Sequence, residues 1–466
     1  MYLDLVPEAC LLGGAVTCLL GGSFLPRQRQ WVARAVATVA LLASLVAALV
    51  AGVPGRTTFD GSYALDAGTT AARVLAAAVT LLVLALGSRE LAGDRRESET
   101  CALLLLAALG VVVLAGASDL LVLAVGFLLA SVPVYGLIGL DRRRVSTEAA
   151  VRTYLLGALA GIVLLLGVTL LTALAGGSTY RELADRLPAA PAAAVAVGVL
   201  AVVLGLLFEA GAVPLHPWVP DAVQGARTTV AAFLTTVPKV GALLALTRLV
   251  EVAPPAVPVR PVVAGLAAAS LLLGTFAAFG QHDLRRLLGW STVSQVGFLL
   301  LPVAAAGRSS TALGSLVVYL AGYAVTTLSL FAVLAALPGQ RTLTDVRGSA
   351  RAHPWLSAVV VLGLLGTAGT PPTAVFLGKL LTFTAAWEAG LAWLVVVAAA
   401  ATVASLFYLL RWLAVVLPWA GGAGAAGAGA RPGRWASGTA AVCAAGVLVV
   451  GVGGGAVLDW GPALVR

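Results

Sequence analysis

Charged side chains are scarce in this sequence. Only 11% of its 466 residues are Asp, Glu, Lys or Arg, whereas 60% are hydrophobic and the mean hydropathy is +1.02. A soluble domain carries roughly 25% charged residues, so the composition excludes a soluble enzyme and indicates an integral membrane protein. Because a helix crosses the hydrocarbon core in about 20 apolar residues, the chain has room for on the order of a dozen spans and for little else.

Cysteine is also rare, with four residues in the whole chain. The four lie far apart within apolar stretches, without the paired spacing that a zinc, haem or iron–sulfur site requires. We therefore interpret them as small buried apolar residues and expect no metal or cofactor to be bound by this chain itself. They are Cys10, Cys18, Cys101 and Cys443.

Long apolar stretches, separated by polar or Pro/Gly-rich segments, predict fourteen transmembrane helices in an all-α polytopic fold. The predicted spans lie near residues 3–24, 31–53, 66–88, 100–117, 119–139, 150–175, 192–213, 228–249, 262–280, 288–305, 312–336, 356–385, 389–416 and 436–457. A Gly/Ala tract at 421–430 is the longest segment of low complexity, and it is interpreted as a connector before the last helix.

Arginine is distributed unequally between alternate loops. Nineteen arginines lie in or beside the odd-numbered loops, and seven lie in the even-numbered loops and at the termini. Cytoplasmic loops collect basic residues, so the odd loops are predicted to face the cytoplasm and both termini to lie outside it, in a multi-pass protein of the inner (plasma) membrane. The net charge of +9 follows from this bias, and we expect the chain to contact the bilayer and no nucleic acid.

A few ionisable residues fall inside the predicted spans. Lys239 lies near the middle of the eighth span, Lys379 in the twelfth and Glu209 near the end of the seventh. An ion at the bilayer centre costs about 2.5–3.5 kcal/mol on insertion scales, so such groups usually face the protein interior and carry function. The two lysines are the only ones in the chain, and an ammonium group can release its proton whereas a guanidinium stays protonated. They are therefore predicted to carry protons; the alternatives are that they extend to the membrane surface or form fixed ion pairs.

Prolines interrupt two of these helices. The segment 214–220 contains three prolines after Glu209, and Pro371-Pro372 lies within the twelfth span. Discontinuous helices beside ionisable residues in two halves of a chain are typical of a transporter site built from an inverted repeat, although a simple kink or loop gives the same pattern. His216, between two of these prolines, completes the set of candidate proton-transfer residues.

Several motifs of the chain are distinctive enough to indicate a protein family. They include Ser118-Asp-Leu-Leu-Val-Leu, Ala212-Val-Pro-Leu-His-Pro-Trp-Val-Pro-Asp, Asp283-Leu-Arg-Arg-Leu-Leu-Gly-Trp-Ser-Thr, Asp345-Val-Arg-Gly and Gly369-Thr-Pro-Pro-Thr-Ala-Val-Phe-Leu-Gly-Lys. With these motifs, from Leu5 to about Arg411, the sequence resembles the antiporter-like, proton-translocating membrane subunits of respiratory complex I, the bacterial NADH:quinone oxidoreductase.

The resemblance implies a bundle of two inverted five-helix repeats, each with a broken helix, within one membrane domain that spans 1–466. The helices at 1–98 would precede the repeats at 99–250 and 262–417, and 418–466 would hold the Gly/Ala loop and the last helix. A central line of ionisable residues would carry protons. Quinone, FMN and iron–sulfur clusters would be bound by partner subunits, so the chain would be part of a translocase and perform no redox chemistry.

Three positions depart from the pattern of these relatives. Leu128 occupies a position that is usually glutamate, Glu209 one that is usually lysine, and Gln295 one that is often histidine. Because the glutamate–lysine pair of the relatives is thought to act as a switch, we hypothesise that Glu209 pairs with Lys239 instead and that the two titrate together.

Two other readings stay open at this point. The same fold and much the same lysines are found in subunits of Mrp-type cation/proton antiporters and of membrane-bound hydrogenases. A divergent structural subunit that no longer pumps is the third reading, which the substitutions at 128 and 209 favour and the presence of both lysines opposes.

Overall fold

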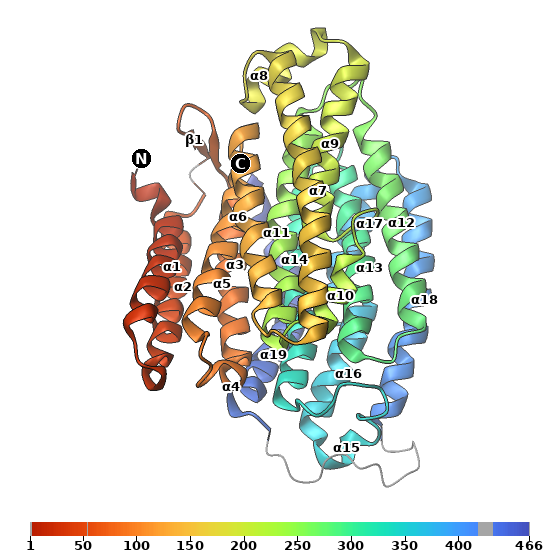
Figure 1. Cartoon of the computed structure of the whole chain (residues 1–466). Helices are drawn as coiled ribbons and strands as arrows, with labels where there is room; N and C mark the ends of the chain where they lie inside the picture. The colour runs from red at the N-terminus through yellow and green to blue at the C-terminus, as the bar shows by residue number, and fades with distance from the viewer. Residues whose placement is uncertain (1, 54, 418–431, 466) are drawn as a thin grey trace.

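The chain forms a bundle of long helices that run roughly parallel to one another (Figure 1). The computed structural model describes residues 2–53, 55–417 and 432–465. Within this part of the chain, thirteen helices are long and apolar enough to cross a membrane. They are α1 (Val6–Phe24), α2 (Trp31–Ala51), α3 (Ala67–Leu86), α5 (Glu97–Gly116), α6 (Leu120–Gly139), α7 (Arg144–Ala175), α9 (Ala192–Ala210), α11 (Thr228–Val252), α12 (Val259–Phe279), α13 (Leu284–Ala304), α14 (Ala312–Ala336), α18 (Ala392–Val416) and α19 (Arg434–Val465).

The remaining elements are short and connect or complete the spans. They are η1 (Tyr2–Leu5), η2 (Arg27–Arg29), the antiparallel strands β1 (Arg56–Thr58) and β2 (Tyr63–Leu65), α4 (Ser88–Leu91), α8 (Tyr180–Arg186), η3 (Leu187–Ala189), α10 (Trp218–Gly225), α15 (Ser349–Ala352), α16 (Pro354–Ala368) and α17 (Ala374–Glu388). The hairpin of β1 and β2 was not predicted from the sequence; the two strands have three residues each, too few for a period-two pattern to be recognised.

Local sequence signals explain where several spans begin and end. Asp66, Asp119 and Asp283 each precede a helix and accept hydrogen bonds from backbone N–H groups of its first turn, which is the usual role of an N-cap aspartate. At the other end, α9 and α16 stop at Gly211 and Gly369, which have φ angles of 80° and 84°. Only glycine adopts this left-handed conformation readily.

Within the described residues, thirteen of the fourteen predicted spans are single long helices, and the twelfth is divided. The helices α16 and α17 take its place, separated by a short segment with Pro371-Pro372. The seventh span is likewise followed by a break and by the short buried helix α10. The expectation of an all-α polytopic membrane protein with broken helices is confirmed.

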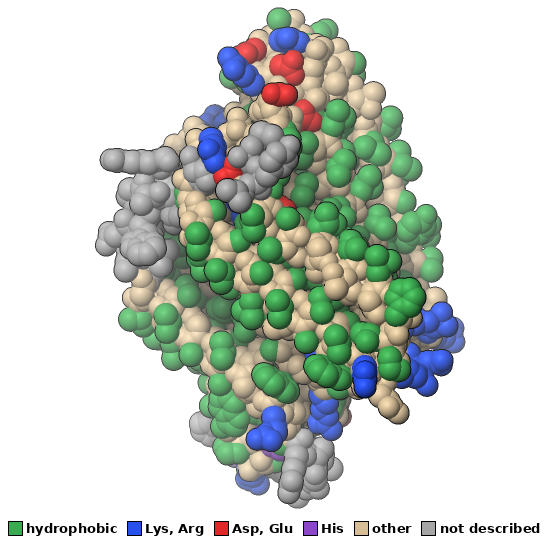
Figure 2. Space-filling view, turned by 90° about the vertical axis from the view of Figure 1, so that its left-hand side faces the viewer, with side chains coloured by type: hydrophobic (Ala, Val, Ile, Leu, Met, Phe, Trp, Pro, Cys, Tyr) green, Lys and Arg blue, Asp and Glu red, His purple; other side chains and the backbone are tan. Residues whose placement is uncertain are grey.

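Burial is graded from the centre of the bundle outwards. The most apolar stretch of α11 is completely buried and those of α13 and α14 are largely buried, whereas only about a third of the corresponding stretch is buried in α1, α2, α18 and α19. Figure 2 shows the result on one face, where hydrophobic side chains cover the middle and charged side chains gather mainly towards the two ends. This is the surface distribution of a protein surrounded by lipid.

A buried polar network ties the first helix to the third. Glu8 accepts hydrogen bonds from Tyr63 at 2.8 Å and from Nε of Arg73 at 2.8 Å, and it forms an ion pair with Arg73 at 2.7 Å. The Arg73 side chain is almost completely buried. Such a pair is costly to break from one side, because the remaining charge stays buried.

Some expectations are not tested by this architecture. The inverted relation of the two repeats, the domain boundaries and the side of the membrane that holds the termini all stay predictions. The first and last helices do begin and end at the same end of the bundle (Figure 1), as an even number of passages requires. The predicted Gly/Ala connector at 421–430 lies outside the described residues.

Candidate functional site

Lys239 lies at the middle of α11, the most deeply buried helix, and its side chain is not exposed at all. The preceding residue is Pro238, which has no N–H group to donate to the carbonyl of Leu234 four residues earlier. The ammonium group of Lys239 donates to this oxygen instead, at 2.7 Å. The nitrogen also lies 5.2 Å from the ring centre of Trp218 on α10, within the range of a cation–π contact.

Lys379 occupies a closely related environment on α17. Its ammonium group donates to the carbonyl oxygen of Ala368 at 3.0 Å and lies 3.4 Å from the hydroxyl of Thr402 on α18. Ala368 is the last residue of α16, so its carbonyl has no partner within the helix. The ring centre of Phe298 lies 4.2 Å from the nitrogen.

The two lysines are therefore bound in the same way. Each donates to a backbone carbonyl that an interrupted helix leaves without a partner, and each faces an aromatic ring. Each also lies beside a left-handed glycine: a Cβ added at Gly211 would stand 3.6 Å from the nitrogen of Lys239, and one at Gly369 would stand 3.5 Å from that of Lys379. The end of α16 thus supplies the acceptor of Lys379, Pro238 within the continuous helix α11 frees that of Lys239, and the glycines at the two breaks leave space for both lysines.

Glu209 is buried at the end of α9, but its contact differs from the predicted one. It accepts a hydrogen bond from the hydroxyl of Ser131 on α6 at 2.6 Å. Within the described part of the chain it forms no direct ion pair with Lys239, although the two charges act on one another electrostatically. The proposed pairing of these two groups is therefore a long-range interaction and not a contact.

Two tyrosines on α14 lie between the lysines, and sequence reasoning missed both. The hydroxyl of Tyr323 donates to the carbonyl of Thr235 at 2.7 Å, one residue from the carbonyl that binds Lys239, and lies 3.1 Å from the hydroxyl of Thr292. Both tyrosine side chains are buried. Within an apolar helix a tyrosine gives little signal, because its ring is as typical of a core as that of phenylalanine.

The second tyrosine connects to the break beside Lys379. Tyr319 donates to the side-chain carbonyl of Gln295 at 2.7 Å, and the amide group of Gln295 donates to the carbonyl of Thr367 at 3.2 Å. Thr367 immediately precedes Ala368, the acceptor of Lys379. Polar groups therefore recur along the bundle centre from Glu209 to Thr402, and we call this set the central polar line. Its members are Glu209, Lys239, Tyr323, Thr292, Tyr319, Gln295, Lys379 and Thr402.

The other candidate positions lie apart from these contacts. His216 is buried with its ring 5.6 Å from that of Trp290, and its Nδ1 atom has no hydrogen-bond partner among the described residues. Leu128 is 44% exposed on the outer surface of the bundle, one helical turn from Ser131. A carboxylate at position 128 would therefore lie at the edge of this chain, facing lipid or a neighbouring subunit.

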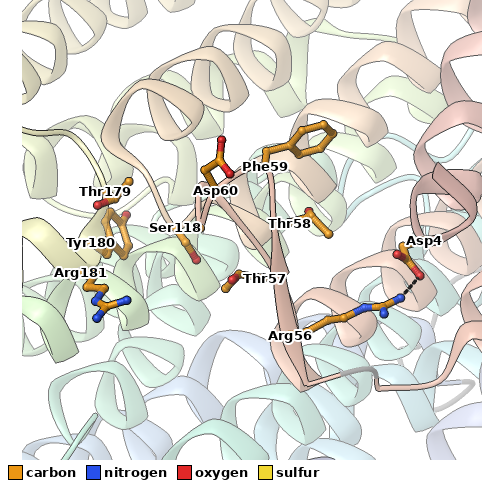
Figure 3. Close-up of a pocket in the computed structure, with 11 residues that line it drawn as sticks. Asp4, Arg56, Thr57, Thr58, Phe59, Asp60, Ser118, Thr179, Tyr180 and Arg181 are labelled. Atoms are coloured by element: carbon orange, nitrogen blue, oxygen red, sulfur yellow. Dashed lines mark hydrogen bonds and ion pairs between the residues drawn. The ribbon is translucent and has the colours of Figure 1, made fainter. Parts of the chain in front are cut away.

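One cavity lies apart from the central polar line. It has a volume of about 720 Å³ and lies at one end of the molecule, between the β1–β2 hairpin and the start of α8. Figure 3 shows Arg56 of the hairpin turned towards Asp4, with which it is paired, and Arg181 of α8 on the far side. Among the described residues, no cluster of His, Cys, Asp and Glu could hold a metal ion.

Fold and site together define a class: a polytopic membrane protein whose interior carries ionisable groups along broken helices, as transporters do. Residues 117–405 match the family described as "NADH:quinone oxidoreductase/Mrp antiporter, TM". The chain belongs to this family, and the resemblance identified from its motifs is confirmed.

Curated relatives place it more narrowly. The chain is 52% identical over 407 residues to NADH-quinone oxidoreductase subunit N of Mycobacterium sp. (strain JLS), with 87% of each chain covered. It is 48% identical over 458 residues to NADH-quinone oxidoreductase subunit N 1 of Streptomyces griseus, covering 98% of this chain and 96% of the relative.

Solved structures agree with these relatives. A chain of respiratory complex I from Thermus thermophilus superposes with a TM-score of 0.84 at 30% identity, covering 98% of this chain and 99% of that one. A chain of the Mrp complex from Dietzia sp. gives the same TM-score at 22% identity, with 99% and 96% covered. The second likeness shows the shared fold alone.

Proposed function

We propose that this chain is a proton-translocating membrane subunit of a complex I-like NADH:quinone oxidoreductase. The observation that carries the proposal is the pair of buried lysines, each bound to a backbone carbonyl that lacks its usual helical N–H partner, with the central polar line between them. The names of the curated relatives point to the same enzyme. Quinone reduction takes place in partner subunits, which hold the FMN and the iron–sulfur clusters, and the membrane subunits of that assembly are this chain's partners.

The central polar line suits proton transfer because its groups can both give and accept protons over short distances. Lys239 and Lys379 are the groups that load and release a proton. The hydroxyl groups of Tyr323 and Tyr319 are donors and acceptors at once and bridge part of the distance between the lysines. Electrons and cofactors are not needed along this line.

Glu209 acts as the charge partner of Lys239 in this proposal. An ionised carboxylate near the lysine stabilises its ammonium form, and protonation of the carboxylate removes that stabilisation. Ser131 can stabilise the ionised state by donating its hydroxyl hydrogen. Two further points belong to the proposal. The two repeats are related by inversion, so that the central polar line opens once towards each side of the membrane. The end of the bundle that holds the arginine-rich loops faces the cytoplasm.

The decisive experiment separates proton transport from electron transfer. Intact complexes that carry Lys239→Ala or Lys379→Ala are reconstituted in proteoliposomes. Proton uptake is measured without an uncoupler, and NADH oxidation is measured separately in the presence of one. We expect both variants to lose most proton transport per NADH oxidised. Arg142→Ala, on an exposed loop, is the control. Unchanged transport in both lysine variants would instead identify a structural subunit.

A second experiment tests the role of the carboxylate. Glu209→Gln keeps the shape of the side chain and its hydrogen bond with Ser131 but removes the charge. The variant is expected to lower proton transport per NADH, and transport equal to that of the parent would refute the proposed charge coupling. Measuring the transport of sodium in place of protons in the same proteoliposomes distinguishes this proposal from a sodium-transporting Mrp-type subunit.

A further inference from the structure

A second cavity lies at the end of the bundle opposite to the β1–β2 hairpin, where α11 begins. Its volume is about 410 Å³. Arginines from four separate segments line it together with two carboxylates, so cationic groups outnumber anionic ones. The charged lining residues are Arg143, Arg227, Arg285, Arg341, Glu90 and Asp141.

Both carboxylates of this cavity are already occupied. Asp141 forms ion pairs with Arg143 and with Arg227, the latter at 3.3 Å. Glu90 caps the first turn of α11, where it accepts hydrogen bonds from the N–H groups of Thr228 at 3.0 Å and of Thr229 at 2.9 Å. A carboxylate at this position also offsets the positive end of the α11 dipole. Among the described residues, neither carboxylate forms an ion pair with Arg285 or Arg341.

Two arginines therefore stand without an anionic partner in contact. Arg285 donates to the carbonyl of Ala226 at 2.7 Å, and within the described residues neither it nor the side chain of Arg341 forms an ion pair. The charges of Arg143 and Arg341 act on Arg285 unfavourably, and those of Asp283 and Glu90 act on it favourably without contacting it. Like charges brought together at the rim of a cavity favour the binding of an anion.

We propose that this cavity is a binding site for a phosphate group, held by Arg285 and Arg341. Guanidinium groups present several N–H donors in a planar fork that matches the oxygens of a phosphate. The volume of the cavity is large enough for such a group together with part of the molecule that carries it. The arginine-rich end is the side predicted to face the cytoplasm, where two sources are present: soluble phosphate esters and the headgroups of anionic lipids.

This site is distinct from the central polar line, since none of its charged residues contacts Lys239, Lys379 or Glu209. An anion held by Arg285 and Arg341 would join the first turn of α13 to the segment that follows α14, beside the α6–α7 loop and the start of α11. The chemistry of recognition is the same for both sources, so they are separated by experiment.

The test uses the intact complex in nanodiscs made only of zwitterionic phosphatidylcholine. Inorganic pyrophosphate is titrated in one arm and its binding followed by phosphorus NMR line broadening. In the other arm phosphatidylglycerol is added to the bilayer, and native mass spectrometry counts the lipids retained. Arg285→Gln and Arg341→Gln are compared with Arg142→Gln, a neighbouring exposed arginine that does not line the cavity.

Each lining variant is expected to weaken binding by about tenfold or more, because each removes a charge-assisted contact, whereas Arg142→Gln leaves binding within about twofold. Binding in the pyrophosphate arm identifies a soluble ligand, and retention in the lipid arm alone identifies a headgroup. The proposal is overturned if the unmodified complex binds neither probe, which includes the case of a neighbouring subunit filling the cavity. It is equally overturned if binding by the double variant equals that of the parent. Sulfate competition against the parent complex provides a measurement that does not depend on the variants being stable.

Discussion

Replacing Pro238 by alanine should disturb proton transport without touching a titratable group. The new residue has an N–H group, which can donate to the carbonyl of Leu234 as in an uninterrupted helix. That oxygen is the acceptor of Lys239 at 2.7 Å. The lysine would then compete with the backbone for the one hydrogen-bond acceptor that it has among the described residues, in a site where its side chain is fully buried.

The size of the effect follows from the contact that is lost. A hydrogen bond to a charged group contributes about 1.5–3 kcal/mol, so the ratio of protonated to neutral lysine at a given proton concentration would fall by about 10- to 150-fold. A lower pH restores the loaded state by mass action. The pH at which proton transport by the complex is half-maximal should therefore move towards acid by about 1 to 2 pH units.

The assay is proton uptake by proteoliposomes across a pH series, divided by the rate of NADH oxidation at each pH. Val237→Ala serves as the matched control, because it shortens a fully buried neighbour without changing which carbonyls are free. An unshifted pH profile in Pro238→Ala would mean that the Leu234 oxygen accepts from both donors, and the reasoning would be refuted. An equal shift in Val237→Ala would assign the effect to packing.

Three further outcomes are expected. Tyr319→Phe leaves the buried amide of Gln295 without its donor, a loss of about 1–3 kcal/mol, and should lower proton transport more than NADH oxidation; equal losses in both would contradict this. Gly451→Leu should detach α19 from the break beside α17, because even a Cβ there would lie 2.0 Å from a backbone oxygen; normal assembly on a native gel would refute the close approach. Arg73→Gln should destabilise the complex by about 3–5 kcal/mol, since it strands Glu8 as a buried charge, and the midpoint of thermal unfolding would reveal it.

Most of the membrane topology could be predicted from the sequence. The predicted span at 228–249 became α11 (Thr228–Val252), and that at 312–336 became α14 with the same bounds. Apolar length decides these elements, and the bilayer imposes that length on every span. Apolar length alone would make the twelfth span one helix, and the prolines at 371 and 372 predicted the interruption that divides it into α16 and α17.

The candidate site was predicted less completely. Lys239, Lys379 and Glu209 stand out because a charge in an apolar run is conspicuous at any position. Their contacts depend on which helices lie side by side, so the Ser131 hydroxyl beside Glu209 could not be foreseen. Tyr319 and Tyr323 were missed for the opposite reason, since nothing in their local sequence sets them apart from ordinary core residues.

The backbone acceptors of the two lysines have a consequence for how these side chains work through a cycle. A carbonyl oxygen cannot take up the proton of an ammonium group, and a neutral amine can still donate one of its hydrogens to the same oxygen. Lys239 and Lys379 can therefore keep one fixed partner whether loaded or empty. A carboxylate in contact would hold the charged form far more tightly than the neutral one. Carbonyl acceptors make the geometry of each lysine nearly independent of its charge, so a proton can be exchanged without the nitrogen having to be repositioned.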